Sequence, residues 1–289
     1  MKDTRREEGV RQTGETDRAN AITEGVIWKQ LLLFFFPILF GTFFQQLYNT
    51  ADAVVVGRFV GKEALAAVGS VGGLNYLVLG FVNGIACGFS IPISWTFGAK
   101  DYREMRRYTA NAVWLSLFFA AVLTVVTVAM TRSILVWTNT PDNIIDLADV
   151  YIRTIFAGIP LTLLYNVTSA LMRALGDSRR PLYFLILSSA LNVVLDLVFI
   201  LNFHMGCAGA AWATILSQLV SGVLCVVYMA KKLPILRMDR AQWRPSAPHI
   251  KTLCGMGFPM GLQNSITAIG SVILSSSVNT LGSTAVASM

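Results

Sequence analysis

Residues 28–58 read WKQLLLFFFPILFGTFFQQLYNTADAVVVGR, an apolar stretch longer than the ~20 residues that a helix needs to cross a bilayer. Its apolar residues are nearly continuous instead of alternating with polar ones, which favours a membrane-spanning helix over a strand of a lipid-facing barrel. Six further stretches have the same character, and we expect one membrane span in each. They cover residues 64–95, 108–133, 143–172, 181–203, 208–230 and 251–281.

The composition supports the same fold class. The chain has 289 residues, of which 54% are hydrophobic and only 13% are charged. A soluble domain usually has about 25% charged residues, because its surface must be covered with polar groups. We therefore predict an all-α integral membrane protein, a six-helix transmembrane bundle followed by a seventh transmembrane helix. The four cysteines and two histidines form no metal-ligand or disulfide pattern, so we expect no metal centre beyond a bound Na⁺.

The positive charges are distributed unevenly over the loops. Most of the 23 Lys and Arg residues lie in the N-terminal segment or in the loops after the second, fourth and sixth predicted spans. The loops on the opposite side contain only Arg58, Lys62 and Arg132. This is the positive-inside pattern, so we predict a multi-pass plasma-membrane protein with a cytoplasmic N-terminus. It also accounts for the net charge of +7 without a nucleic-acid partner.

A repeated pattern suggests how the chain is divided. Phe36-Pro37 recurs as Phe258-Pro259, 222 positions later, and residues 61–66 resemble residues 282–287, 221 positions later. Six spans separate the two copies, which indicates a parallel repeat of a six-helix unit. We predict a disordered cytoplasmic tail (1–25), a six-helix lobe (26–232), a cytoplasmic inter-lobe linker (233–250) and the first helix of a second lobe (251–289). On this interpretation the chain is a fragment, or one part of a transporter whose missing second lobe belongs to the same or another chain.

Two acidic residues fall inside the predicted spans, where an ionisable side chain costs about 2.5–3.5 kcal/mol and demands a reason. Asp52 lies near the end of the first span, and Asp196 is the only charged residue of the fifth. Asn192 precedes Asp196 by four residues and therefore shares its helix face. At ~1.5 Å per residue, Asp52, Asp196, Thr214 and Tyr151 all fall roughly 9–14 Å below the outer surface.

Oxygen-bearing side chains at one depth predict a coupling-ion site. They could coordinate Na⁺, which prefers hard oxygen ligands, or the two carboxyl groups could share a proton. A structural role is the alternative, in which an acid pairs with Arg153 or caps a broken helix. We expect Arg153 to pair with Asp149, four residues earlier, and Pro37 to bend the first span. The glycines of the second span are expected to be close-packing sites, because no phosphate-binding GK[ST] motif follows them.

Several motifs together resemble the multidrug and toxic compound extrusion (MATE) family over about residues 26–289. The first span contributes Pro37-Ile38-Leu39 and the run from Gln45 to Asp52, followed by Gly57-Arg58 and Ala64-Leu65-Ala66-Ala67-Val68-Gly69. The later matches are Tyr151-Ile152-Arg153 with Gly158-Ile159-Pro160, Gly176-Asp177-Ser178-Arg179-Arg180-Pro181 with Asn192 and Asp196, and residues 206–214, GCAGAAWAT.

The resemblance implies a twelve-helix transporter of two lobes. We expect no enzyme and no cofactor, because a membrane-embedded enzyme finds no support in a sequence without HExxH, GxSxG or a Ser-His pair. The resemblance also implies exchange of Na⁺ or H⁺ for drugs and other small organic cations, in contact with membrane lipid. The family's ion-site residues correspond here to Asp52, Asn192, Asp196 and Thr214, with Tyr151 a looser match and Pro37 as the helix-bending residue. The repeat aligns Asp52 with Ile273, so a second acid is not expected there. A lipid-linked oligosaccharide flippase of the same superfamily and a non-transporting membrane scaffold remain alternatives.

Overall fold

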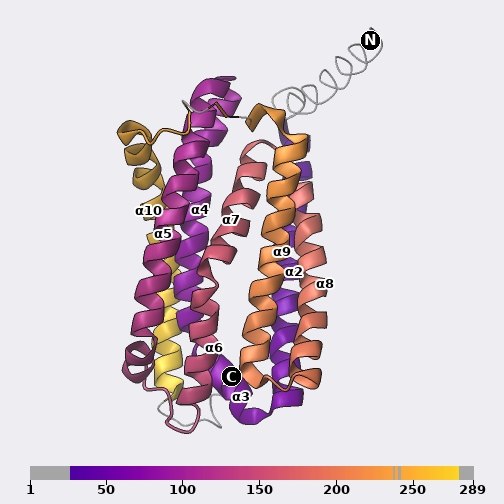
Figure 1. Ribbon diagram of the computed structural model, residues 1–289, viewed down its shortest axis with the longest axis vertical. Coiled ribbons are helices and arrows are strands. Elements are labelled where there is room, and N and C mark those ends of the chain that lie inside the picture. The colour runs from indigo at the N-terminus through magenta and orange to yellow at the C-terminus, as the bar shows by residue number, and fades with distance from the viewer. Residues whose placement is uncertain (1–26, 237, 240–241, 280–289) are drawn as a thin grey trace.

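The structure, a computed structural model, describes residues 27–236, 238–239 and 242–279. Within these residues the chain forms helices and no strands, and the long helices lie side by side in an upright bundle (Figure 1). The all-α prediction is therefore confirmed. The elements are α2 (Ile27–Val55), η1 (Val56–Val60), α3 (Lys62–Ser70), α4 (Gly72–Gly98), α5 (Tyr102–Trp137), α6 (Ile145–Ala157), α7 (Ile159–Ala174), α8 (Arg179–Leu197), η2 (Val198–Asn202), α9 (Gly206–Lys232), η3 (Pro234–Leu236) and α10 (Ala247–Asn279).

Most of the predicted spans appear as long apolar helices. Within the described residues, five helices are long and apolar enough to cross a membrane, or six if α6 and α7 together form one bent span. The predicted seventh span forms α10, which has 33 residues but is not among those six, because polar and small residues interrupt its apolar sequence. The predicted tail (1–25) and the second copy of the repeat (282–287) lie outside the described residues.

The second predicted span, 64–95, is not a single helix. The chain turns at Gly61, whose φ of 124° lies in a region that side chains with a Cβ rarely adopt. It then forms the short helix α3, and α4 begins only after Val71. The apolar pattern alone could not show this break, because residues of α3 such as Ala64, Ala66 and Ala67 are buried and small.

The fourth predicted span is bent in the middle. Its two halves, α6 and α7, meet at Gly158 with an angle of 46° between them. A Cβ at Gly158 would overlap the Ile215 side chain of α9, so α9 packs directly against the bend. Pro160 follows, at the start of α7, where a missing backbone N–H costs no hydrogen bond.

Helices α4 and α10 are in close contact through glycine. A Cβ at Gly88 would lie 2.5 Å from the Cα of Gly257, and a Cβ at Gly84 would lie 2.5 Å from the carbonyl oxygen of Met260. From the other side, a Cβ at Gly261 would lie 2.8 Å from the Phe81 ring. The prediction that these α4 glycines serve close packing is confirmed at Gly84 and Gly88, and it explains how α10 can lie against this bundle.

The segment between α9 and α10 is held against α5 by hydrogen bonds. The Arg106 side chain donates to the carbonyl oxygen of Ile235 at 2.7 Å, and the Trp114 indole donates to that of Trp243 at 3.0 Å. The Ser246 amide donates to the side-chain oxygen of Asn111 at 2.9 Å. The first turn of α10 is attached in the same way, since His249 Nε2 lies 2.7 Å from Glu104 Oε2.

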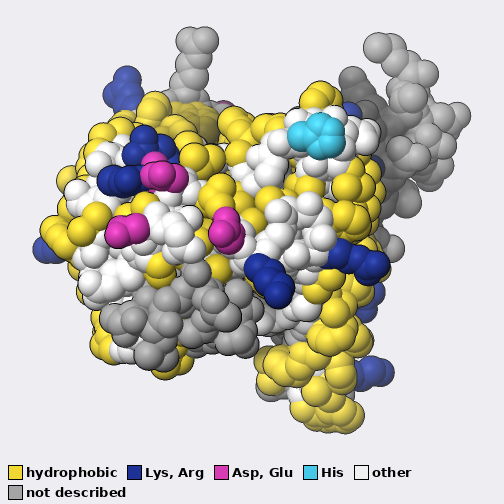
Figure 2. All heavy atoms as spheres, turned by 90° about the horizontal axis from the view of Figure 1, so that it is seen from below, with side chains coloured by type: hydrophobic (Ala, Val, Ile, Leu, Met, Phe, Trp, Pro, Cys, Tyr) yellow, Lys and Arg dark blue, Asp and Glu magenta, His cyan; other side chains and the backbone are white. Residues whose placement is uncertain are grey.

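The two ends of the bundle carry different charges. The upper end in Figure 1, where α2, α5, α8 and α10 begin, has mostly basic residues, among them Lys100, Arg103, Arg106, Arg107, Arg173, Arg179, Arg180, Lys231, Lys232 and Lys251. The opposite end is shown in Figure 2, where acidic and basic side chains are mixed over the face. Its charged residues include Arg58, Lys62, Glu63, Arg132, Asp142, Asp146, Asp149 and Arg153.

Candidate ion and substrate site

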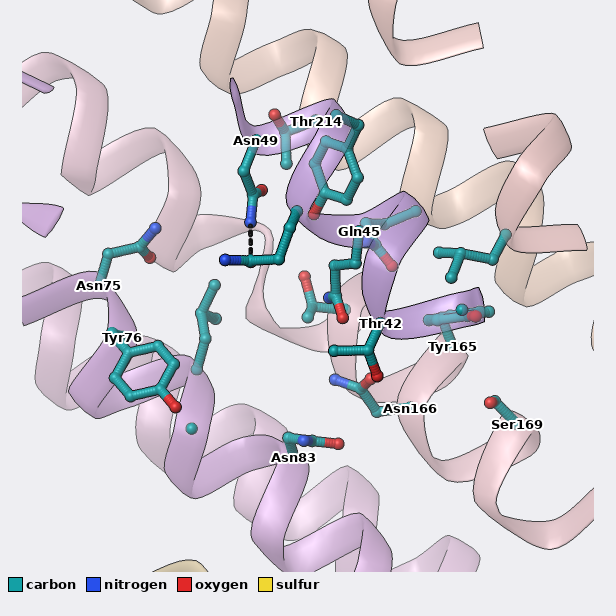
Figure 3. A pocket seen from close by; sticks show the side chains of 18 of the residues that line it. Thr42, Gln45, Asn49, Asn75, Tyr76, Asn83, Tyr165, Asn166, Ser169 and Thr214 are labelled. Carbon is teal, nitrogen blue, oxygen red and sulfur yellow. Dashed lines mark hydrogen bonds between the residues drawn. The ribbon is translucent and has the colours of Figure 1, made fainter. Parts of the chain in front are cut away.

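A cavity of about 860 Å³ lies inside the bundle, between helices α2, α4, α6, α7, α8 and α9. Its lining contains many carboxamide and phenol groups, which can both donate and accept hydrogen bonds. Figure 3 shows Thr42 and Gln45 of α2 and Asn166 of α7 pointing into the same space. The lining amides are Gln45, Gln46, Asn49, Asn75, Asn83, Asn166 and Gln218, and the tyrosines are Tyr48, Tyr76, Tyr151 and Tyr165.

Two charged side chains line this cavity, Asp52 and Arg173, among all its described lining residues. Asp52 is in the last turn of α2, toward the lower end of the bundle, and Arg173 is in the last turn of α7, toward the upper end. The cavity therefore has a negative group toward one end and a positive group toward the other, with neutral polar groups between them.

The two acids predicted from the sequence lie near each other. Asp196 on α8 is completely buried, and Asp52 is 8% exposed and faces the cavity. The two carboxyl groups are close enough to interact electrostatically, and Tyr151 of α6, 5% exposed, interacts with both of them. Helices α2, α6 and α8 thus place these three side chains within electrostatic range of one another.

Asn192 and Thr214 complete the cluster. The Asn192 amide donates to the Thr214 hydroxyl at 3.5 Å, and that hydroxyl donates to the backbone carbonyl of Ala210 at 3.1 Å. Four buried oxygens in the cluster have no hydrogen-bond donor within the described part of the chain: Asp52 Oδ1, Asn192 Oδ1 and both carboxylate oxygens of Asp196. Buried acceptors are almost always satisfied in proteins, so these oxygens are available to accept from water or to bind a proton or a cation.

A change of helix type follows each acid. Helix α2 passes into the π-helical turn η1 four residues after Asp52, and α8 passes into η2 two residues after Asp196. The turns η1 and η2 also contact each other, which places both helix ends beside the cluster. Short π-helical segments are rare and occur frequently at functional sites, but no sequence pattern predicted these two.

The predicted site residues divide into two groups. Asp52, Tyr151, Thr214 and Pro37 line the cavity, whereas Asn192 and Asp196 lie behind its wall. Helix α2 continues through Pro37, whose effect on the helix axis stays a prediction. Arg153 pairs with Asp149 at 3.2 Å as predicted, so it does not neutralise Asp52 or Asp196.

Sequence reasoning missed the other cavity residues. The carboxamides share one face of α2, because Gln45, Asn49 and Asp52 are spaced four and three residues apart. Asn166, Ser169 and Arg173 share one face of α7 for the same reason. The spacing was visible, but Arg173 was counted as a basic loop residue because it stands at the end of an apolar stretch.

Comparisons with known proteins agree with this architecture. The chain is 30% identical over 268 residues to "Probable multidrug resistance protein YoeA" of Bacillus subtilis (strain 168). The aligned region covers 90% of this chain and 58% of that protein. It is 34% identical over 271 residues to "Probable multidrug resistance protein YpnP" of the same organism, covering 92% and 59%. The chain thus spans about three fifths of the length of these curated relatives.

Solved structures resemble the fold as well. An inward-facing multidrug resistance MATE transporter of the MOP superfamily superposes with a TM-score of 0.78 at 28% identity, covering 84% of this chain and 56% of that one. A MATE crystal structure in the bent conformation gives a TM-score of 0.80 at 27% identity, covering 88% and 56%. The family model described as MatE matches residues 37–198, more than half of the sequence, and includes Asp52, Tyr151, Asn192 and Asp196. The chain belongs to the MatE family.

Proposed function

We propose that this chain supplies the ion-coupling half of a secondary transporter that exchanges Na⁺ or H⁺ for drugs and other organic cations across the plasma membrane. The observation that carries the proposal is the cluster of unpaired buried oxygens on Asp52, Asn192 and Asp196. Two carboxylates, an amide oxygen and the Thr214 hydroxyl form a donor set that suits Na⁺, which takes oxygen ligands. Protons on the two acids are the alternative, since each proton removes a buried negative charge and turns one carboxyl oxygen into a hydrogen-bond donor.

The position of the cluster supports coupling to a solute. Asp52 belongs to both the cluster and the cavity wall, so a change in its charge alters the field inside the cavity. An organic cation beside Asp52 and a coupling ion bound to Asp52 and Asp196 would compete for the same negative charge. Such competition is the requirement for exchange, since the ion and the solute then bind in turn.

The proposed sidedness places the basic end of the bundle in the cytoplasm. The positive-inside pattern supports this orientation, and the mixed charges of the opposite face agree with it. Alternating access in two-lobe transporters takes place around a site between the lobes, so the complete exchange activity would need a second lobe beside this one.

A flippase for lipid-linked oligosaccharides is the second candidate function, and Arg173 is the observation that favours it. A flippase that handles phosphorylated lipids requires basic residues in its cavity, and Arg173 lies there. Asp52 is the observation that favours the first candidate, because a carboxylate repels phosphate. Efflux of ethidium, a permanent cation, supports the antiporter, whereas movement of a phosphorylated lipid between leaflets supports the flippase.

The ion site can be tested on the purified chain in lipid nanodiscs. An ion that binds only the folded protein raises its stability, by about 2.7 kcal/mol at 100 times the dissociation constant. We expect the melting temperature to rise with Na⁺ at constant ionic strength, or with falling pH, and the rise to disappear in Asp196→Asn. Asp149→Asn is the matched control, since Asp149 is paired with Arg153 away from the cluster. A wild-type response equal to that of Asp196→Asn would exclude the ion site and favour a scaffold.

A further inference from the structure

Arg173 is a basic residue that the fold turns toward the cavity. It lies in the last turn of α7, and its guanidinium donates a hydrogen bond to the hydroxyl of Ser169, one turn earlier. Long side chains in a helix lean toward the helix N-terminus, which for α7 is the middle of the bundle. Arg173, Ser169 and Asn166 therefore belong to the same cavity wall.

The guanidinium of Arg173 has no acidic partner within the described residues. No carboxylate lies within 4.0 Å of it, and the acid nearest in sequence, Asp177, pairs with Arg180 at 2.6 Å instead. A guanidinium keeps its charge at any relevant pH and presents several donors in one plane. Part of this donor set therefore stays available to a group inside the cavity.

A second donor group faces the same part of the cavity. Ser178, only 6% exposed, lines the cavity immediately before α8, and its hydroxyl makes no capping hydrogen bond to that helix. No hydrogen bond of this hydroxyl occurs elsewhere in the described part of the chain. The N-terminus of α8 is already occupied by an acid, because the Arg180 amide donates to Asp177 Oδ1 at 3.2 Å, and the next residue, Pro181, has no N–H. A buried hydroxyl without a partner and a guanidinium without an acidic partner are together the kind of donors that proteins provide for anionic oxygens.

We propose that Arg173 and Ser178 bind an anionic oxygen group, a carboxylate or phosphate, carried by the transported solute. The proposal rests on the transport function, because it assigns one end of the same cavity. Asp52 lies toward the other end, and the carboxamides of Gln45, Asn49 and Asn166 lie in the wall between. The cavity is thus built for an elongated organic zwitterion, whose cation lies toward Asp52 and whose anion lies toward Arg173.

Two dyes that differ in one group can test this assignment. Rhodamine 110 has a free benzoate, and rhodamine 123 is its methyl ester, so only the former is zwitterionic. Binding to the full chain in phosphatidylcholine nanodiscs can be followed by fluorescence anisotropy. We expect the free acid to bind more tightly than the ester, and Arg173→Gln to reduce this preference about tenfold, since a hydrogen bond to a charged group contributes that much or more.

Matched variants keep the result interpretable. Arg179→Gln removes an equal charge from the same region, but Arg179 is exposed and does not line the cavity, so the preference for the acid should be unchanged. Arg173→Lys preserves the charge without the planar guanidinium and should retain part of the preference for the acid. This variant still tests the proposal if Arg173→Gln folds poorly. Equal binding of the two dyes by the wild-type chain, or no binding of the acid, overturns the proposal.

A lipid headgroup could supply the same phosphate chemistry. If the anion at Arg173 belongs to lipid, adding phosphatidylglycerol to the nanodiscs should raise the melting temperature only while Arg173 is present, and should abolish the preference for the acid dye. That result overturns the assignment to the solute. Failure of the anion subsite leaves the ion response of Asp196 intact, whereas loss of that response contradicts the transport proposal even if Arg173 selects the acid.

Discussion

Asn192 of α8 and Thr214 of α9 hold the candidate ion site together: the Asn192 amide nitrogen donates to the Thr214 hydroxyl at 3.5 Å. That bond fixes which way the amide faces, and its oxygen, without a donor among the described residues, belongs to the same cluster as the carboxylate of Asp196. In the proposed site, this arrangement leaves the amide oxygen available as a ligand for a cation.

Replacing Thr214 by Val keeps the side-chain shape and removes the hydroxyl. We expect the Na⁺- or pH-dependent rise in melting temperature to become smaller, because the Asn192 amide is then free to rotate its oxygen away. A tenfold loss of ion affinity corresponds to about 1.4 kcal/mol. Differential scanning fluorimetry of the purified variant measures the rise in melting temperature with Na⁺ or with falling pH. Thr252→Val, at a half-buried position of α10, a helix that does not line the cavity, should respond like the wild type. An unchanged response in Thr214→Val would contradict a role for this hydroxyl.

The two acids should differ in their accessibility to a carboxyl reagent. Asp52 faces the cavity and Asp196 is completely buried behind its wall. We expect dicyclohexylcarbodiimide to modify Asp52 faster than Asp196, with the modified peptide identified by mass spectrometry. Asp52→Asn should remove the faster reaction. Faster modification of Asp196 would show that the cavity reaches that residue by another route.

The glycine contact between α4 and α10 should not tolerate a methyl group. In Gly88→Ala the new Cβ would lie 2.5 Å from Gly257 Cα, so the helices must separate. Overpacking of this kind costs about 1–3 kcal/mol, and thermal unfolding of the purified chain should show the loss. Gly255→Ala on α10, where a Cβ meets nothing within 4 Å, should be neutral or stabilising. Equal stability of the two variants would mean that α4 and α10 do not pack as described.

Asn111 should hold the segment before α10 in place. It is 1% exposed, accepts from the Ser246 amide and donates to the backbone carbonyl of Arg107. Asn111→Ala leaves the Ser246 N–H without this acceptor, at a cost of about 1–3 kcal/mol. Hydrogen–deuterium exchange of a peptide covering residues 242–250 should become faster, while Thr252→Ala should leave it unchanged. Unchanged exchange in Asn111→Ala would show that the other contacts hold the segment by themselves.

The orientation in the membrane can be tested with single cysteines. After replacing Cys87, Cys207, Cys225 and Cys254 by Ala, a new cysteine is placed at Arg179 or at Lys62, both exposed and at opposite ends of the bundle. A membrane-impermeant maleimide added to intact cells should label Lys62→Cys and not Arg179→Cys. Permeabilised cells should show both labelled. The reverse pattern would place the basic end outside and contradict the positive-inside interpretation.

The sequence by itself determined the fold class, the helices and the acids. Continuous apolar stretches must form helices in lipid, so the approximate positions of the spans could be predicted, although two of them are broken into two helices. A carboxylate in such a stretch needs a compensating reason, so Asp52 and Asp196 could be recognised as candidates, and helical spacing added Asn192. Their similar estimated depth added Thr214 and Tyr151, and the family resemblance pointed to the same residues.

The tertiary structure decided what the residues contact. Only packing shows that α2, α6, α8 and α9 bring Asp52, Tyr151, Asp196 and Thr214 together, that Asp52 faces a cavity, and that Asp196 lies behind its wall. The breaks at Val71 and Gly158 and the π-helical turns were likewise invisible, because apolarity reports burial in lipid or protein and is the same on either side of a bend. Arg173 is the clearest case, because its position near a helix end predicts a loop residue. Only the structure shows that its side chain bonds Ser169 of α7 and lines the cavity.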